Sequence, residues 1–251
     1  MRALRAGARL LLLIAWLLLC LPLHGGWRLA GARSPWPRRF LGGVAAISGA
    51  RVRTDGGPVA GPALLIANHT SWLDILVLGG AANARFVSKD GVERWPVVGF
   101  LARLNDTIFI SREARAAVRA QADTLRRELA GPRPVALFPE GTTTDGRALL
   151  PFRASLLAAA EGAAVHPVAI DYGEARPEIA WFGDEPAIRN VLRVWGRPGR
   201  FDVIVRTLPA LPASANRKAL AAAAQRAVEG ALGLASAALP ARPAASIGGS
   251  A

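Results

Sequence analysis

The feature that most constrains this chain is an alternation, from residue 60 onward, of apolar runs with strand and helix patterns. This alternation is typical of an α/β fold, and we expect a mixed, largely parallel sheet flanked by helices. Pro167 lies inside one predicted strand, which favours an edge strand or a bulge there. We predict strands over residues 63–67, 85–88, 107–111, 135–138, 165–172, 178–182 and 201–207, and helices over residues 75–78, 95–104, 113–130, 154–160 and 218–235.

The N-terminal 54 residues differ from the rest, because they hold nine arginines and no acidic residue. Residues 10–27 form a stretch of 18 residues without Lys, Arg, Asp or Glu, about 27 Å long as a helix. Three interpretations stay open: a signal peptide cleaved near residues 30–32, a transmembrane helix, or a helix lying partly in the membrane. We favour a retained anchor, with residues 40–47 as a return helix that completes a helix pair.

We divide the chain into three regions by composition. Residues 1–50 are expected to be a membrane anchor, residues 51–235 a catalytic domain, and residues 236–251 a disordered tail of Ala, Pro, Gly and Ser. Lys and Arg outnumber Asp and Glu by 31 to 18, which suits an anionic membrane or substrate. Nucleic acid is the least favoured partner, because the chain has one tyrosine and no dense basic run interleaved with aromatics.

Metal and disulfide sites are not expected. The single cysteine, Cys20, cannot form an intrachain disulfide. His24, His69 and His166 are far apart in the sequence, which argues against a zinc site. His166 lies in an apolar predicted strand, so we give it no catalytic role.

His69 and Asp74 lie five residues apart, at the turn between the strand over residues 63–67 and the following helix. The turn lets the Asp74 carboxylate fold back towards the imidazole, which is the arrangement general-base catalysis needs. The same stretch also fits a capping box, with Ser71 as the N-cap and Asp74 at the third helical position. We predict that His69 is the base and that Asp74 orients it.

Polar residues recur directly after the apolar strands: His69, Lys89, Arg112 and Glu140. In open α/β sheets, ligands bind at the edge formed by the carboxyl ends of the strands. A base, two cations and a carboxylate are therefore expected near one another at that edge.

Four stretches carry a resemblance to a known family. Residues 68–74, 107–112, 138–142 and 165–170 are similar, in order and spacing, to the four motifs of the glycerolipid acyltransferases. This is the 1-acyl-glycerol-3-phosphate acyltransferase family, whose first motif is H-x4-D. The resemblance covers roughly residues 44–208.

The resemblance implies acyl transfer from acyl-CoA or acyl carrier protein to a hydroxyl group of a lysolipid. The sequence shows no site for a metal or prosthetic group, so no cofactor is expected besides the thioester co-substrate. His69 would take the proton of that hydroxyl, whose oxygen would attack the thioester directly. Backbone N–H groups near residues 70–74 are expected to stabilise the oxyanion. Because these thioesters are cytoplasmic, we expect the enzyme on the cytoplasmic face of the inner cell membrane.

Acceptor binding is expected from residues around the second and third motifs. Arg112, with Lys89, would hold an anionic head group, and Glu140 would orient Arg112 or an acceptor hydroxyl. The full predicted substrate-binding set is Lys89, Arg112, Glu140, Gly141, Thr142 and Arg153.

The third motif departs from the family pattern, because Thr143 occupies the position where an arginine often contacts phosphate. Arg147 or Arg153 could substitute from nearby. The first expected acceptor is 1-acyl-glycerol-3-phosphate, giving phosphatidate. Residues 138–146 and 151–153 are similar to the lyso-ornithine-lipid acyltransferase branch, so lyso-ornithine lipid is the alternative acceptor.

Two other classes of function compete with acyl transfer. A hydrolase or thioesterase would use Ser71 as its nucleophile, but no G-x-S-x-G elbow occurs in the chain. The second class is an inactive, membrane-anchored lipid-binding module.

Overall fold

A computed structural model describes the chain except for residues 60, 111–116, 158–162, 215 and 235–251. Its centre is a seven-stranded sheet in the order β1-β7-β6-β2-β5-β3-β4. Neighbouring strands are parallel except β6 and β7, which confirms the mixed, largely parallel sheet. The strands are β1 (Ala50–Asp55), β2 (Ala63–Ala67), β3 (Arg85–Lys89), β4 (Ile108–Ile110), β5 (Val135–Leu137), β6 (Ala164–Asp171) and β7 (Phe201–Thr207).

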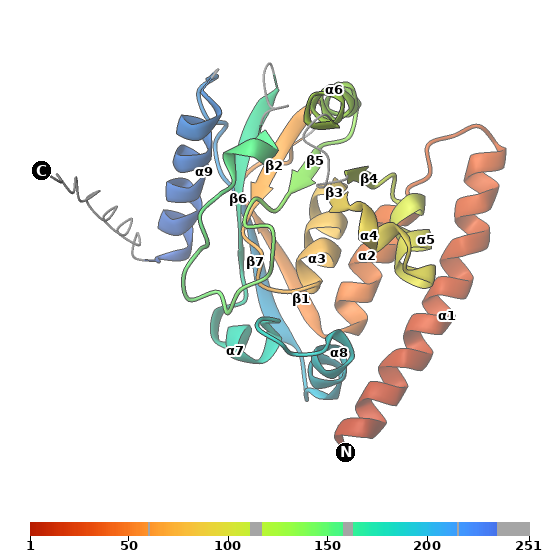
Figure 1. Cartoon of the computed structure of the whole chain (residues 1–251). Coiled ribbons are helices and arrows are strands. Elements are labelled where there is room, and N and C mark those ends of the chain that lie inside the picture. Colours follow the sequence, from red (N-terminus) through yellow and green to blue (C-terminus); the bar gives the residue numbers. More distant parts are fainter. Residues whose placement is uncertain (60, 111–116, 158–162, 215, 235–251) are drawn as a thin grey trace, which may run out of the picture.

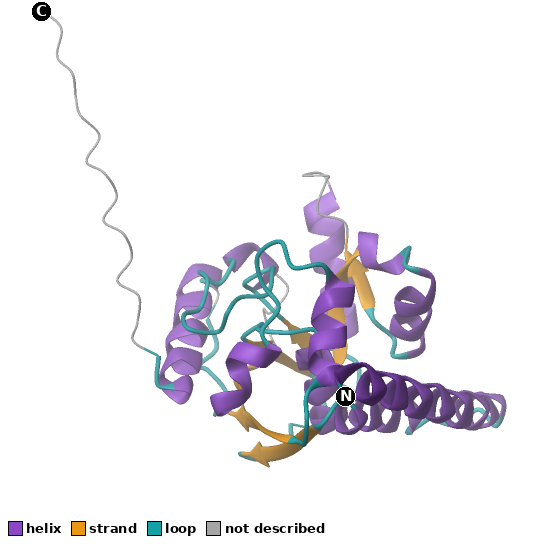
Figure 2. Cartoon of the chain, turned by 90° about the horizontal axis from the view of Figure 1, so that it is seen from below, coloured by secondary structure: helices purple, strands orange, loops and turns teal. Residues whose placement is uncertain are grey.

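Helices cover both faces of this sheet (Figures 1 and 2). Helices α2 and α3 lie on the face nearer α1, and α9 lies on the other. The α-helices are α1 (Arg2–Leu29), α2 (Trp36–Ile47), α3 (Leu73–Ala82), α4 (Asp90–Glu93), α5 (Pro96–Leu104), α6 (Ala117–Leu129), α7 (Arg176–Ile179), α8 (Ala187–Gly196) and α9 (Arg217–Leu232). Two short 3-10 helices are η1 (Ala154–Leu157) and η2 (Gly173–Ala175).

The central strand β2 shows why its sequence is apolar throughout. Leu65 and Ala67 pack into the core beneath α2 and α3, whereas Leu64 and Ile66 pack into the core beneath α6 and α9. Successive side chains of a strand point to opposite faces, so a strand covered on both sides needs apolar residues at every position. This strand carries the turn at His69 to the carboxyl edge of the sheet.

Some sequence-based expectations for the elements were wrong. The strand predicted over residues 178–182 is not formed, because residues Arg176–Ile179 form helix α7, where Pro177 occupies one of the first helical positions. The described part of the helix predicted over residues 154–160 is a 3-10 helix. Helix α8 was not predicted. Strand β1 was not predicted either, because it buries only Ala50 and has no apolar run.

The edge-strand expectation for Pro167 was also wrong, because β6 lies between β2 and β7. Its pairing with β7 begins at Val168, opposite Thr207. The Pro167 carbonyl accepts a hydrogen bond from the Leu208 N–H just past that strand. Pro167 therefore lies just outside the paired residues of β6 and β7. Its missing N–H removes no hydrogen bond between these two strands.

Helix α1 is long and apolar enough to cross a membrane by length and composition, and most of its surface is exposed. Its beginning is held to α8, because the Arg9 guanidinium donates to the carbonyls of Val194 and Trp195 at 2.9 and 3.0 Å. A helix does form over the predicted residues 40–47, as part of α2, and its residues Leu41 and Ala45 belong to the core of the sheet domain. Its predicted contact with the membrane remains a prediction. The three-region division remains a prediction, and its tail lies outside the described residues.

Candidate active site

The turn between β2 and α3 places an imidazole against a buried carboxylate. His69 Nδ1 lies 2.8 Å from Oδ2 of Asp74, and Asp74 is fully buried. The same oxygen accepts the backbone N–H groups of Thr70 and Ser71 at 2.7 and 2.8 Å. Ser71 Oγ accepts the N–H of Leu73 at 3.3 Å, but the N-cap of α3 is Trp72, so the predicted capping box with Ser71 as the N-cap is not formed. Asp74 lies in the first turn of α3, and its carboxylate holds both the turn before the helix and the histidine.

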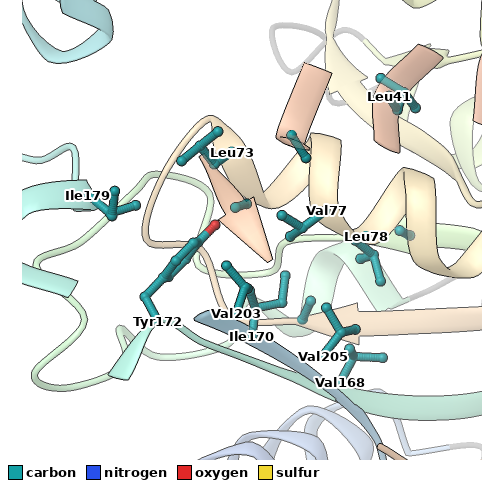
Figure 3. Packing of buried hydrophobic residues seen from close by; sticks show 14 of the residues in the cluster. Leu41, Leu73, Val77, Leu78, Val168, Ile170, Tyr172, Ile179, Val203 and Val205 are labelled. Carbon is teal, nitrogen blue, oxygen red and sulfur yellow. The ribbon is translucent and has the colours of Figure 1, made fainter. Parts of the chain in front are cut away.

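A tyrosine completes the surroundings of Asp74. The Tyr172 hydroxyl donates to Oδ1 of Asp74 at 2.6 Å from a fully buried position among the apolar residues below α3 (Figure 3). Burial and, second, the Asp74 charge raise the pKa of Tyr172 well above its ordinary value, so the phenol stays a donor. Sequence reasoning missed this residue, although it is the single tyrosine and ends a predicted strand at the reactive edge.

The backbone of His69 is held as firmly as its ring. Its N–H donates to Oε1 of Glu140 at 2.7 Å, and its carbonyl accepts from the N–H of Thr144 at 3.0 Å. The ring stacks on Phe138 with 4.2 Å between centroids. Because the carboxylate occupies Nδ1, Nε2 is the nitrogen that can meet a substrate, and the side chain is 17% exposed.

Glu140 connects the third motif to the first. It is almost fully buried, and its second oxygen accepts the backbone N–H of Leu150 at 2.9 Å. Burial raises the pKa of Glu140 to about 7, against the opposing effect of the N–H groups of Leu150 and His69. Both oxygens contact backbone groups, and the predicted contact with an acceptor remains a prediction.

Gly141 of the third motif lies against Arg153, another predicted binding residue. Gly141 has a positive φ of 78°, which glycine adopts without strain. A Cβ atom added at Gly141 would meet the Arg153 guanidinium at 3.0 Å, so the glycine also permits this close contact. Arg153 is tied to the loop by its N–H, which donates to the carbonyl of Pro139, and Thr142 is exposed beside it.

The other cationic residues that were predicted to bind the acceptor have no described contact with His69 or Asp74. Lys89 is exposed at the carboxyl end of β3, which lies two strands from β2 and runs in the same direction. Arg112 lies outside the described residues. The Arg147 side chain is 84% exposed, 3.8 Å from Asp145. The binding roles of all three remain predictions.

The expected oxyanion donors are used elsewhere. The N–H groups of Thr70 and Ser71 bind Asp74, that of Leu73 binds Ser71 Oγ, and that of Asp74 binds the Ser71 carbonyl. For these four groups the expectation was wrong, because polar groups buried away from water need hydrogen-bond partners, and the carboxylate of Asp74 and the side chain and carbonyl of Ser71 take these donors. The helix start therefore holds the acid of the site.

Metal ligands do not gather at this edge. Within the part of the chain that the structure describes, no group of three or more His, Cys, Asp or Glu residues lies close enough to hold a metal ion. His166 instead contacts the Leu208 carbonyl through Nδ1 at 3.1 Å.

The geometry is that of a histidine paired with and oriented by a buried acid. A sequence profile described as Acyltransferase matches residues 49–171, a range that contains His69, Asp74 and Glu140. A lyso-ornithine lipid O-acyltransferase of Rhodobacter capsulatus is 37% identical over 92% of this chain and 90% of its own length. The chain belongs to the glycerolipid acyltransferase family.

One further relative and one solved structure are similar to this acyltransferase. A 1-acyl-sn-glycerol-3-phosphate acyltransferase of Neisseria gonorrhoeae is 37% identical over 48% of this chain and 50% of its own. The second is the crystal structure of the 1-acyl-sn-glycerophosphate acyltransferase of Thermotoga maritima. It aligns with 92% of this chain and 98% of its own chain, with a TM-score of 0.62 and 22% sequence identity. The latter likeness confirms the fold.

Proposed function

We propose that this acyltransferase moves a fatty acyl chain from acyl-CoA or acyl carrier protein to the free hydroxyl of lyso-ornithine lipid. The observation that carries this choice is the extent of similarity. The lyso-ornithine-lipid relative matches over nearly the whole chain, whereas the glycerol-phosphate relative of equal identity matches over about half of it. Thr143, which stands where a phosphate-binding arginine is common in the family, supports the same choice.

The reaction follows from the atoms around His69. Nε2 takes the proton of the acceptor hydroxyl, and the oxygen attacks the carbonyl carbon of the thioester. The tetrahedral intermediate collapses, the carbon–sulfur bond breaks, and the proton returns from His69 to the leaving thiolate. Asp74 keeps the proton of the neutral imidazole on Nδ1 and stabilises the imidazolium between the two steps.

The other contacts of His69 hold it rigidly in position. Glu140 and Thr144 hold the backbone of His69, and Phe138 holds its ring. A base that is already oriented needs no reorganisation when substrates arrive, and well-placed reactants gain much of the rate in such reactions.

Membrane attachment is a further part of the proposal. Helix α1 is apolar and exposed, yet Arg9 ties its beginning to α8 and Trp16 donates to the Phe40 carbonyl of α2 at 3.2 Å. A helix docked on the protein at both points suits a position along one leaflet. We propose that α1 is retained and holds the enzyme on the cytoplasmic face of the inner membrane, where its donor is made.

Thiol release is the direct test, measured with acyl-CoA and with acyl carrier protein in turn. The acceptors are lyso-ornithine lipid, 1-acyl-glycerol-3-phosphate, and none. Release that requires lyso-ornithine lipid supports the proposal, and release without an acceptor identifies a thioesterase. No release from either donor, with the His69→Ala variant as the blank, favours a lipid-binding module.

Lysophosphatidate is the second candidate acceptor. The glycerol-phosphate relative matches the motif region with the same identity, which favours this acceptor for that part of the chain. A kcat/KM at least tenfold higher for 1-acyl-glycerol-3-phosphate than for lyso-ornithine lipid would establish it in place of the first.

A further inference from the structure

Helix α5 exposes an apolar surface that the reaction does not use. We define the α5 patch as Trp95, Val97, Val98 and Phe100, whose exposed fractions run from 44% to 64%. Residues 95–102 contain no charged side chain. Four large apolar residues within six consecutive positions exceed the scattered exposure that is ordinary for a soluble surface, and such patches mark interaction sites.

Helix α5 also contacts the N-terminal helix pair. Leu101 and Leu104 each lie one helical turn after a patch residue, Val97 and Phe100. They line an apolar hollow together with Leu17 and Leu21 of α1 and with Trp36 of α2. Figure 1 shows α5 beside these two helices. The α5 patch therefore lies next to α1.

The exposed surface of α1 has the same chemistry as the patch. Leu11 and Leu18, which lie two turns apart on one face of the helix, are exposed large apolar residues, and the helix is the proposed membrane attachment. The patch extends that face from the helix pair to the sheet domain. A bilayer is the partner that covers two adjoining apolar surfaces belonging to separate helices of one chain.

The ends of the patch fit the polar boundary of a bilayer. Trp95, at the beginning of α5, is the residue type enriched where hydrocarbon meets head groups. Arg94 precedes it and is exposed, as is Lys89 at the end of β3, and both can reach lipid phosphates. The nearby acid Glu93 is engaged with Arg103 of α5 at 3.5 Å.

We propose that the α5 patch inserts into the same leaflet as α1 and forms a second point of membrane contact. The inference rests on the proposed attachment through α1. Because α5 follows β3, this contact brings the carboxyl edge of the sheet to the lipid boundary. A lysolipid could then reach His69 without leaving the membrane surface.

Depth-dependent quenching tests this with the full chain. In a Cys20→Ala background, Val97→Cys is labelled with an environment-sensitive fluorophore and mixed with vesicles of phosphatidylglycerol and phosphatidylethanolamine. The matched control is Ala222→Cys, which is exposed on α9 on the other face of the sheet. We expect blue-shifted emission and quenching by shallow nitroxide lipids at position 97, and neither at position 222.

Each other outcome overturns the inference in a distinguishable way. Protein that sediments with vesicles while the label at position 97 stays in water would show that α1 binds alone. Blue-shifted emission without lipid quenching, together with a doubled mass in detergent, would show that a second copy covers the patch. Protein that stays in the supernatant would overturn the inference along with the proposed membrane attachment.

Discussion

The phenol oxygen of Tyr172 lies 2.6 Å from Oδ1 of Asp74, although the two residues are 98 positions apart in the chain. This bond joins the end of β6 to the first turn of α3. The other oxygen of Asp74 accepts His69 and two backbone N–H groups, so Tyr172 occupies the side that the local turn leaves open. We therefore expect Tyr172 to position Asp74 and, through it, His69.

The Tyr172→Phe variant should lower kcat by about tenfold and leave both KM values nearly unchanged, because a hydrogen bond to a charged group contributes about 1.5–3 kcal/mol. The split between kcat and KM is the readout, because a carboxylate with one donor fewer orients the imidazole less firmly without contacting either substrate. A lower melting temperature with unchanged kcat would show a merely structural role.

Removing the base and removing its acid should have different consequences for stability. We expect His69→Ala to remain folded and to lose about 10²–10⁴-fold in kcat, the usual contribution of a general base. Asp74→Asn should lose comparable activity and also melt at a lower temperature, because its amide NH2 would face donors inside a buried site. Thermal melting in detergent and acceptor-dependent thiol release measure the two effects. Near-normal activity per folded molecule in both variants would leave Asp74 only its capping role.

Glu140 should make stability depend on pH. Burial raises its pKa to about 7 from an ordinary value of 4.5, so between these values the folded protein keeps a proton that the unfolded chain releases. Stability from this group is thus complete below about pH 4.5 and falls as the pH rises towards 7. Glu140→Gln should flatten the decline by up to about 1.4 kcal/mol per pH unit, measured by urea unfolding in detergent. An unaltered slope between pH 5 and 7 would assign the dependence to other groups.

The crossing of α2 and α3 should not tolerate a methyl group. A Cβ at Gly80 would lie 2.7 Å from the Gly42 Cα and 2.9 Å from its nitrogen, and backbone cannot move aside as a side chain does. Gly80→Ala should cost about 1–3 kcal/mol of stability by overpacking. Gly230→Ala is the control, because that glycine is also helical with open space around it, and it should gain about 0.5–1 kcal/mol. Equal melting temperatures for the two variants would contradict the close crossing.

Thr143→Arg distinguishes the two acceptors. With lyso-ornithine lipid as the natural acceptor, the new arginine should give no gain for that lipid. It should raise kcat/KM for 1-acyl-glycerol-3-phosphate by about tenfold, since a charge-assisted hydrogen bond to phosphate contributes about 1.5–3 kcal/mol. Arg147→Ala should be nearly silent with lyso-ornithine lipid because that side chain is 84% exposed. A large loss in Arg147→Ala would instead place a phosphate of the acceptor at that arginine.

Elements with a continuous local pattern were predictable, and those defined by their neighbours were not. The strand Ala63–Ala67 was identified because burial on both faces demands five apolar residues in a row. Strand β1 was missed because it pairs only with β7 and exposes Arg51 and Arg53. An edge strand or a bulge was predicted at Pro167, because periodicity does not encode that its pairing with β7 begins only at Val168.

The sequence by itself determined the family and predicted the pairing of His69 with Asp74. His69 and Asp74 are five residues apart, so the turn between a strand and a helix is enough to bring them together. Only the tertiary structure decided how that pair is held. Glu140 and Tyr172 reach it from 71 positions and from 98 positions away, through a sheet order that no local pattern contains. Residues close in sequence meet by local geometry, whereas distant ones meet only when strand pairing and core packing select one arrangement.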